Sequence, residues 1–293
     1  MTDPVRITEP GFYHLTPEDY FADPCPDPSL SQSGIKTLVG KTAARFAHEH
    51  PRLGSPKEAL SKANRLRGDI CHRLALGRGK EYRVGDFADW RTKAAQEFKA
   101  QCAADNVTPA LAKDMEGYAR MAAIAKARIE ELFKGKPYET EVVMVWREET
   151  AFGPIWCRGM LDAHCPSLGM AADPKFTDLD ATEETFAKQA NTLGYAVQNR
   201  FYKRGIAALE PRLAGRIQFR HLMIESAEPN CSQAFDLSGA YQAVADSRIS
   251  VAMHRFGECM KRGVWPGYAP GVRRVEPPAW VLKGLYEQEE AAA

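Results

Sequence analysis

The spacing of apolar residues changes once along this chain, near Lys136 and Pro137, and this change restricts the fold more than any other feature. Before it, apolar residues recur every three or four positions, as in Leu66, Ile70 and Leu74, which predicts helices. After it the spacing becomes two, because residues 139, 141, 143 and 145 fall on one face of an extended segment and the apolar residues 142, 144 and 146 on the other, which predicts a strand. A largely helical first part of about 135 residues followed by strands and helices is expected to form an α/β fold.

The expected elements follow from the same periodicity and from capping residues. Strands are expected at 139–146, 155–164, 170–175, 216–226 and 232–235. Helices are expected from about 34, and at 59–76, 90–102, 111–133, 182–209 and 238–262. Thr108 and Pro109 are interpreted as the cap and first residue of the 111–133 helix. The first three strands are joined by short connections and should therefore be antiparallel neighbours.

These elements predict one mixed α/β (α+β) domain with a helical N-terminal elaboration. Residues 1–30 are rich in proline and aromatic residues and are expected to form an irregular arm. The domain is expected to span 31–282, with a helical part at 31–135 and the sheet core at 136–265. The acidic and alanine-rich residues 283–293 are expected to form a flexible tail.

Composition excludes several classes of protein. The 39 basic residues nearly balance the 38 acidic ones, so the chain is no polycation of the histone kind. Its longest purely apolar runs are about five residues, far short of the ~20 of a membrane span. The first 11 residues lack the apolar stretch of a secretory signal, and the seven cysteines contain no CxxC pair. We therefore expect a cytoplasmic protein without a membrane partner, whose cysteines are mostly buried thiols.

Basic residues are nevertheless concentrated in two segments. Residues 36–83 carry twelve Lys or Arg against four Asp or Glu, and residues 200–220 carry six against one. Such runs are most often solvated helix faces. Two of them in a nearly neutral chain also fit a surface for a polyanion such as DNA, and both interpretations stay open at this point.

Asp162, Asp173 and Lys175 form the pattern with the clearest chemical meaning. Asp162 lies in an apolar stretch of the second expected strand, while Asp173 and Lys175 are two apart on the third and share a face. Two carboxylates on one face are costly to bury without a cation. Carboxylates suit Mg²⁺, and a neighbouring lysine can orient or deprotonate water for attack on phosphorus. The alternative is an ordinary surface ion pair between Asp173 and Lys175.

Asp162, ten residues and then Asp173-Pro174-Lys175 resemble the signature of the PD-(D/E)XK nuclease superfamily. Further motifs resemble its exonuclease VIII (RecE) and lambda exonuclease branch, over roughly residues 10–282. In chain order these motifs are Gly11-Phe-Tyr13, Ser31-Gln-Ser33, Gly68-x-x-x-His72, Glu139-Thr-Glu141-Val142, Tyr195-x-x-Gln198-x-x-x-Tyr202 and Trp265-Pro266.

The resemblance implies a PD-(D/E)XK restriction-endonuclease-like core, with a central mixed sheet flanked by helices. It also implies a metal-dependent exodeoxyribonuclease of phage-type recombination, encoded by a prophage, that degrades one strand of double-stranded DNA from its 5′ end. It implies a homo-oligomeric ring and a single-strand annealing protein of the RecT kind as partner. The implied metal is Mg²⁺, with Mn²⁺ as the alternative. The implied metal-site residues are Glu141, Asp162, Asp173, the carbonyl of Pro174 and His72. Lys175 would position the attacking water, Gln198 and His72 would support the site, and basic residues of 36–83 would contact phosphates.

Two residues depart from the family pattern. Leu161 replaces the proline before the first aspartate, which should be harmless because the aspartate supplies the chemistry. Pro174 removes an N–H from a strand expected to be central, so a bulge or a lost hydrogen bond is expected there. Two alternative functions follow: an endonuclease or repair nuclease on the same core, or a non-catalytic DNA-binding module whose site has decayed.

Overall fold

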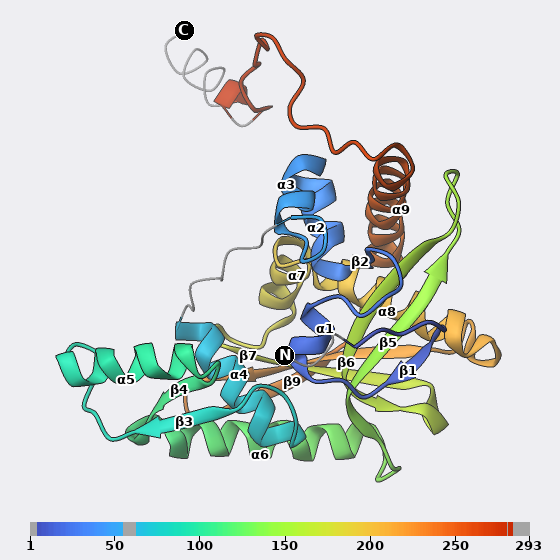
Figure 1. Cartoon of the computed structure of the whole chain (residues 1–293). Coiled ribbons are helices and arrows are strands. Elements are labelled where there is room, and N and C mark those ends of the chain that lie inside the picture. Colours follow the sequence, from blue (N-terminus) through green and yellow to red (C-terminus); the bar gives the residue numbers. More distant parts are fainter. Residues whose placement is uncertain (1–4, 55–62, 280, 284–293) are drawn as a thin grey trace, which may run out of the picture.

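The computed structural model describes residues 5–54, 63–279 and 281–283, and its centre is a seven-stranded mixed sheet (Figure 1). Its strand order is β1-β5-β6-β7-β8-β9, and β2 pairs with β6. The strands are β1 (Gly11–Tyr13), β2 (Leu30–Ser31), β5 (Glu139–Glu148), β6 (Ile155–Cys165), β7 (Met170–Thr177), β8 (Gln218–Glu225) and β9 (Ser232–Phe235). Within this sheet, β7–β8 and β2–β6 are parallel and the other described pairs are antiparallel, so the predicted mixed sheet is confirmed.

Helices lie on both sides of this sheet (Figure 1). One core cluster joins β5 and β6 to α2 (Gln32–Gly40), α3 (Ala43–Glu49), α8 (Tyr195–Leu209) and α9 (Gly239–Arg262). A second joins the paired ends of β6, β7 and β8 to α4 (Ala63–Leu76) and α6 (Met115–Leu132). Because both surfaces of the sheet are covered, the central strands are apolar on both faces, and Val142 to Trp146 are all buried.

Strands β6 and β7 pair along only part of their length, so the sheet forks. Their pairing runs from Cys165 and Met170 to Ala163 and Ala172 and ends there. Beyond this point β6 stays paired with β5 and gains β2 on its free edge. β7 continues along β8 as far as Thr177. Asp162 and Asp173 are therefore the first residues past the fork.

Pro174 is accommodated by this fork. The pairing of β7 with β8 passes through Pro174 without a change of register, so the expected bulge is absent. On the other side of β7 no strand pairs beyond Ala172 among the described residues, so a missing N–H there breaks no ladder.

Two expected helices differ from the structure. The helix expected at 182–209 is divided into α7 (Glu183–Thr192) and α8, because Gly194 between them adopts a left-handed φ of 79°. The helix expected at 111–133 begins only at Met115, because residues 108–111 form strand β4 (Thr108–Leu111). That strand pairs with β3 (Tyr82–Gly85) in a separate two-stranded sheet beside α5 (Lys93–Ala104). Local capping signals cannot reveal such a distant strand partner.

The N-terminal segment is more ordered than an irregular arm. It contains β1, which pairs with β5, the short helix α1 (Pro17–Phe21), and β2. Residues 59–62 of the expected 59–76 helix, and the expected tail apart from residue 283, lie outside the described residues. No helix among the described residues is long and apolar enough to cross a membrane. All seven cysteines are free thiols, and all but Cys231 are buried.

Candidate metal centre and active site

Four polar residues form a row across four neighbouring strands at the fork. The β5–β6 pairs on either side, Thr140 with Ala163 and Val142 with Leu161, bring Glu141 next to Asp162. The β6–β7 register, extended by one residue, places Asp162 opposite Asp173. Asp173 is paired in turn with His221 of β8. Glu141, Asp173 and His221 are buried and Asp162 is nearly so. The tertiary structure thus gathers carboxylates that are up to 32 residues apart in the sequence.

Three of the predicted residues form a group that could hold a metal ion. One ligand atom each from His72, Glu141 and Asp162 lies within 4.8 Å of the others. Burial, with the negative charge of Asp173, raises the pKa of Glu141 to about 7 and the pKa of Asp162 well above its usual value. Carboxylates that resist ionisation for these reasons are the kind that a divalent cation stabilises. The donor set therefore fits Mg²⁺ or Mn²⁺.

His72 enters this group from α4, with Nδ1 3.7 Å from Oδ2 of Asp162. Burial and the positive charge of Lys175 lower the pKa of His72 to about 4. A hydrogen bond to the carbonyl of Pro174 acts in the opposite direction. His72 is thus neutral at physiological pH, as a metal ligand must be, and the Pro174 carbonyl faces the same site.

Asp173 has a different environment from Asp162. Lys175 Nζ lies 2.6 Å and His221 Nδ1 3.2 Å from its Oδ2, and Gln198 Nε2 donates to its Oδ1 at 2.8 Å. Burial opposes the charge of Asp173, but Lys175 and His221 outweigh burial and hold the pKa of Asp173 below its usual range. The same ion pair raises the pKa of Lys175 against the effect of burial. Both residues are therefore charged, and the predicted Asp173–Lys175 pair exists inside the site, not on an open surface.

Gln198 and the tyrosines of its motif come from α8. Gln198 is half-buried, and its Nε2 donates a hydrogen bond to Asp173. The ring of Tyr195 lies 5.4 Å from Lys175 Nζ. Gly159 of β6 leaves space for the ring of Tyr202, since a Cβ there would come within 2.7 Å of it. The motif thus positions one helix against β6 and β7 together.

The side chains of the candidate metal site border a cavity of about 630 Å³. Its other wall consists of α1 and the first turn of α2, and includes Tyr20, Phe21 and Ser31. Phe21 is 60% exposed at this wall. The cavity is large enough for a nucleotide-sized group, and all six side chains predicted for the site, Glu141, His72, Asp162, Asp173, Lys175 and Gln198, border it.

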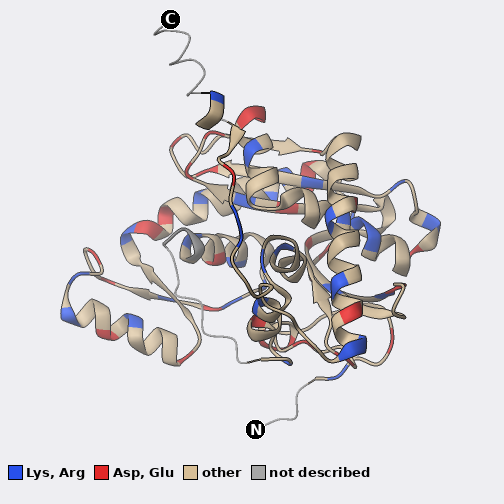
Figure 2. Cartoon of the chain, turned by 90° about the horizontal axis from the view of Figure 1, so that it is seen from above, with Lys and Arg blue, Asp and Glu red and all other residues tan. Residues whose placement is uncertain are grey.

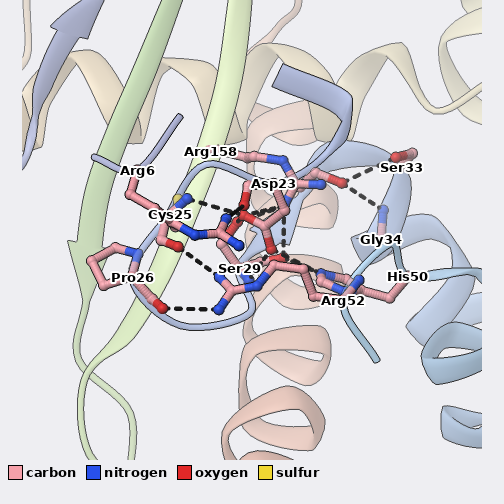
Figure 3. A network of polar contacts seen from close by, with 11 residues as sticks. Arg6, Asp23, Cys25, Pro26, Ser29, Ser33, Gly34, His50, Arg52 and Arg158 are labelled. Atoms are coloured by element: carbon pink, nitrogen blue, oxygen red, sulfur yellow. Dashed lines mark hydrogen bonds and ion pairs between the residues drawn. The ribbon is translucent and has the colours of Figure 1, made fainter. Parts of the chain in front are cut away.

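A buried polar network attaches this second wall to β6 (Figure 3). Asp23, which is fully buried, lies 3.2 Å from Arg158 and 3.3 Å from His50, and it accepts hydrogen bonds from Ser29. Arg158 also donates to the Ser29 carbonyl. Arg158 lies on the strand face that carries Asp162, but its charge is neutralised by Asp23. It therefore anchors the N-terminal segment.

Cations of both basic segments form ion pairs, and charges of both signs are interspersed over the molecule (Figure 2). In 200–220, four of the six cations pair with acidic residues outside the segment: Arg200 and Arg204 with Asp246, Arg204 also with Glu148, and Lys203 and Arg220 with Asp236. In 36–83, Arg45, Arg67, Arg73 and Arg83 also form ion pairs with acidic residues. Lys80 of the first segment borders the cavity, which makes it the best placed of these cations to contact a phosphate there.

His221 was missed by the sequence analysis. It is fully buried in the middle of β8 and in contact with Asp173. A polar residue inside the run Phe219 to Ile224 was the available signal. Its significance depends on which strand lies beside β8, and the sequence does not give that register.

Searches of known protein families and of curated proteins found no match to this chain. Among solved structures, the chain is similar to a protein from Eubacterium rectale described as a "putative exonuclease", with a TM-score of 0.55 and 17% identity over 92% of this chain and 98% of that one. A phage-related exonuclease from Haemophilus somnus matches with a TM-score of 0.32 and 10% identity, over 80% and 96% of the two chains. The first likeness shows a shared fold.

The chain is therefore a mixed α/β protein that shares its fold with the Eubacterium rectale protein. At the fork of its sheet, His72, Glu141 and Asp162 form a group that fits a divalent metal.

Proposed function

We propose that this chain is a divalent-metal-dependent nuclease that hydrolyses phosphodiester bonds of DNA. The observation that carries the proposal is the row of Glu141, Asp162 and Asp173 at the fork, with Lys175 beside it in a 630 Å³ cavity. The exonuclease-like fold supports it. A row of buried carboxylates has a high electrostatic cost, which is understandable where a cation and a phosphate are to be bound.

The side chains have separable roles in this reaction. Asp162, Glu141 and Asp173 would hold Mg²⁺, or Mn²⁺, with the Pro174 carbonyl and His72. When bound, the ion polarises the phosphate and makes water a better nucleophile. Lys175 stays protonated because Asp173 and Asp162 raise its pKa, so it orients the water and stabilises negative charge.

The substrate we propose is double-stranded DNA, degraded from its 5′ end in phage-type recombination. The ordered motifs from Gly68 to Tyr202 support this choice, as does Lys80 at the cavity. A homo-oligomeric ring around the duplex and a RecT-like annealing protein as partner belong to the same proposal. A cytoplasmic location and a prophage origin accompany it.

Release of nucleotides from linear duplex DNA labelled at either end tests the proposal. Asp173→Asn and Glu141→Gln should each lower the rate by about 10²–10⁴-fold in Mg²⁺, as expected for loss of a group acting at the reacting centre. Glu139→Gln is the matched control for Glu141→Gln, because Glu139 lies on the same strand but is exposed and paired with His14. The control should retain wild-type activity.

The pattern of products separates the alternatives. Loss of label from the 5′ end alone supports the proposed polarity. Cutting of closed circular DNA would favour the endonuclease alternative. Wild-type protein that binds Mg²⁺ and DNA but cuts neither form would contradict the nuclease proposal and favour a non-catalytic module.

A further inference from the structure

Three donors from three different elements converge on the carboxylate of Asp173. Lys175 comes from the same strand, Gln198 from α8 and His221 from β8. Lys175 and His221 share Oδ2, and Gln198 alone bonds Oδ1. A carboxylate has about four acceptor positions, so three donors leave one for a metal ion and fix the direction in which it points.

His221 differs from the other two donors in its burial. Its side chain is fully buried. Its ring is surrounded by aromatic rings, with centroids 5.4 Å from Tyr195, 5.5 Å from Phe186 and 5.1 Å from Phe219. Lys175 is a flexible side chain with one fifth of its surface exposed. If Lys175 turns toward the water in the reaction, His221 is the donor that remains on Oδ2.

We propose that His221 is a positioning residue, whose Nδ1–H holds the Asp173 carboxylate in the orientation required for metal binding. The proposal rests on the metal site proposed above and adds a residue that no motif includes. An ionised carboxylate only accepts hydrogen bonds, so the contact requires the proton to be on Nδ1 of His221. Partners of this kind, one step removed from the metal, typically contribute 10–100-fold to metal affinity or activity.

The test compares His221→Phe with His221→Asn in the full chain. Phenylalanine keeps the ring and its aromatic neighbours but removes the donor. Asparagine places an N–H donor near the position of Nδ1 but leaves the aromatic surroundings underpacked. If His221 positions Asp173, His221→Phe should weaken Mg²⁺ binding, measured by calorimetry, by about 10–100-fold with an unchanged or higher metal-free melting temperature. His221→Asn should bind Mg²⁺ within about threefold of wild type despite a lower metal-free melting temperature.

A purely structural role predicts the opposite order for metal binding. His221→Phe would then bind Mg²⁺ as wild type does, and His221→Asn would lose affinity along with stability. Either of these results would overturn the proposal. His164→Phe is the matched control. His164 is also buried, on β6, and its ring stacks on that of Phe12 with the centroids 5.3 Å apart. This control should leave Mg²⁺ affinity unchanged.

A second measurement covers a His221→Phe protein that does not fold. Nitrogen-15 NMR of the wild-type histidine side chains reports which ring nitrogen carries the proton. A proton on Nδ1 of His221 supports the proposal, and a neutral ring protonated only on Nε2 overturns it. Wild-type protein that binds no divalent ion would contradict the proposed function, while the NMR result would still decide the contact to Asp173.

Discussion

Asp162 and Asp173 are the same residue type in the same row of the sheet, yet their electrostatic environments are opposite. Burial dominates at Asp162 and raises its pKa, whereas Lys175 and His221 lower the pKa of Asp173. Asp173 is thus ionised before any cation arrives, and Asp162 gains most from one. This division of roles depends on the donors around each carboxylate.

Lys175→Ala should separate metal binding from hydrolysis. Removing a positive neighbour leaves Mg²⁺ binding intact or tighter, so the rise in melting temperature on adding Mg²⁺ should persist. Nucleotide release should fall by about 10²–10⁴-fold, the usual range for losing a positioned acid–base group. Lys188→Ala, on an exposed residue of α7 paired with Glu184, is the control. Loss of the Mg²⁺ response in Lys175→Ala would instead show that Lys175 mainly holds Asp173.

Asp23→Asn should remove a pH-dependent part of the stability. Burial opposes the charge of Asp23, but hydrogen bonds from His50 and Ser29 and the charge of Arg158 hold its pKa below the usual value. Because the pKa of Asp23 is lower in the folded chain than in the unfolded chain, its ionised carboxylate stabilises the fold at pH values above about 4, the unfolded pKa. This stabilisation is lost as the pH falls through the lower pKa of the folded chain. The substitution should lower the free energy of unfolding, measured in urea, by about 3–5 kcal/mol at pH 7 and by much less near pH 3.

Asp105→Asn is the control for the Asp23 variant. Asp105 pairs with Arg83 at 2.8 Å in an exposed position, where ion pairs contribute little to stability. Its unfolding curve should stay close to wild type at both pH values. If Asp23→Asn lowered the free energy of unfolding equally at pH 7 and pH 3, the charge of Asp23 would not explain its contribution to stability.

At the scale of elements, the turn between α7 and α8 sets where Gln198 points. Gly194 begins α8 with a φ of 79°, a conformation that costs an L residue roughly 1–2 kcal/mol. Gly194→Ala should therefore lower the free energy of unfolding by about that amount and weaken the hydrogen bond from Gln198 to Asp173. Denaturant unfolding and the rate of nucleotide release measure the two effects.

Gly117→Ala provides the contrast within a regular helix. Gly117 lies inside α6, where an added Cβ meets only the end of Arg120, at 4.0 Å. Alanine there should raise stability by about 0.5–1 kcal/mol without affecting nucleotide release. Equal effects of the two substitutions would show that the φ of Gly194 is not what matters.

At the scale of the whole molecule, the proposed ring predicts a definite mass in solution. One chain has a mass of 32.6 kDa, and a single subunit of this size does not encircle a duplex. Analytical ultracentrifugation should therefore detect a species of three or four chains at micromolar concentration. A monomer throughout that range would remove the ring and favour the endonuclease alternative.

The proposed contact with phosphates predicts strong salt dependence. If several cations of residues 36–83 neutralise phosphates, DNA affinity should fall by orders of magnitude between roughly 50 and 200 mM salt. Fluorescence anisotropy with a labelled duplex measures the affinity at each salt concentration, and the slope of log affinity against log salt concentration gives the dependence. Lys80→Ala, at the cavity, should reduce the slope by about one, whereas Arg212→Ala, at a residue paired with the nearby Glu210, should not. A slope near zero would leave these charges as solvated helix faces.

Local pattern was sufficient to predict β6, β7, β9 and α9, and the position of Asp173 and Lys175 on one face of a strand. These features depend on spacing within one segment, which hydrophobic burial enforces. Only the tertiary structure decided the proximity of Glu141 and Asp162, the contact between His221 and Asp173, and the pairing of β3 with β4. Each of these depends on the register between segments far apart in the chain. The break at Gly194 depends on the left-handed φ of a single residue, which a continuous helical pattern does not reveal.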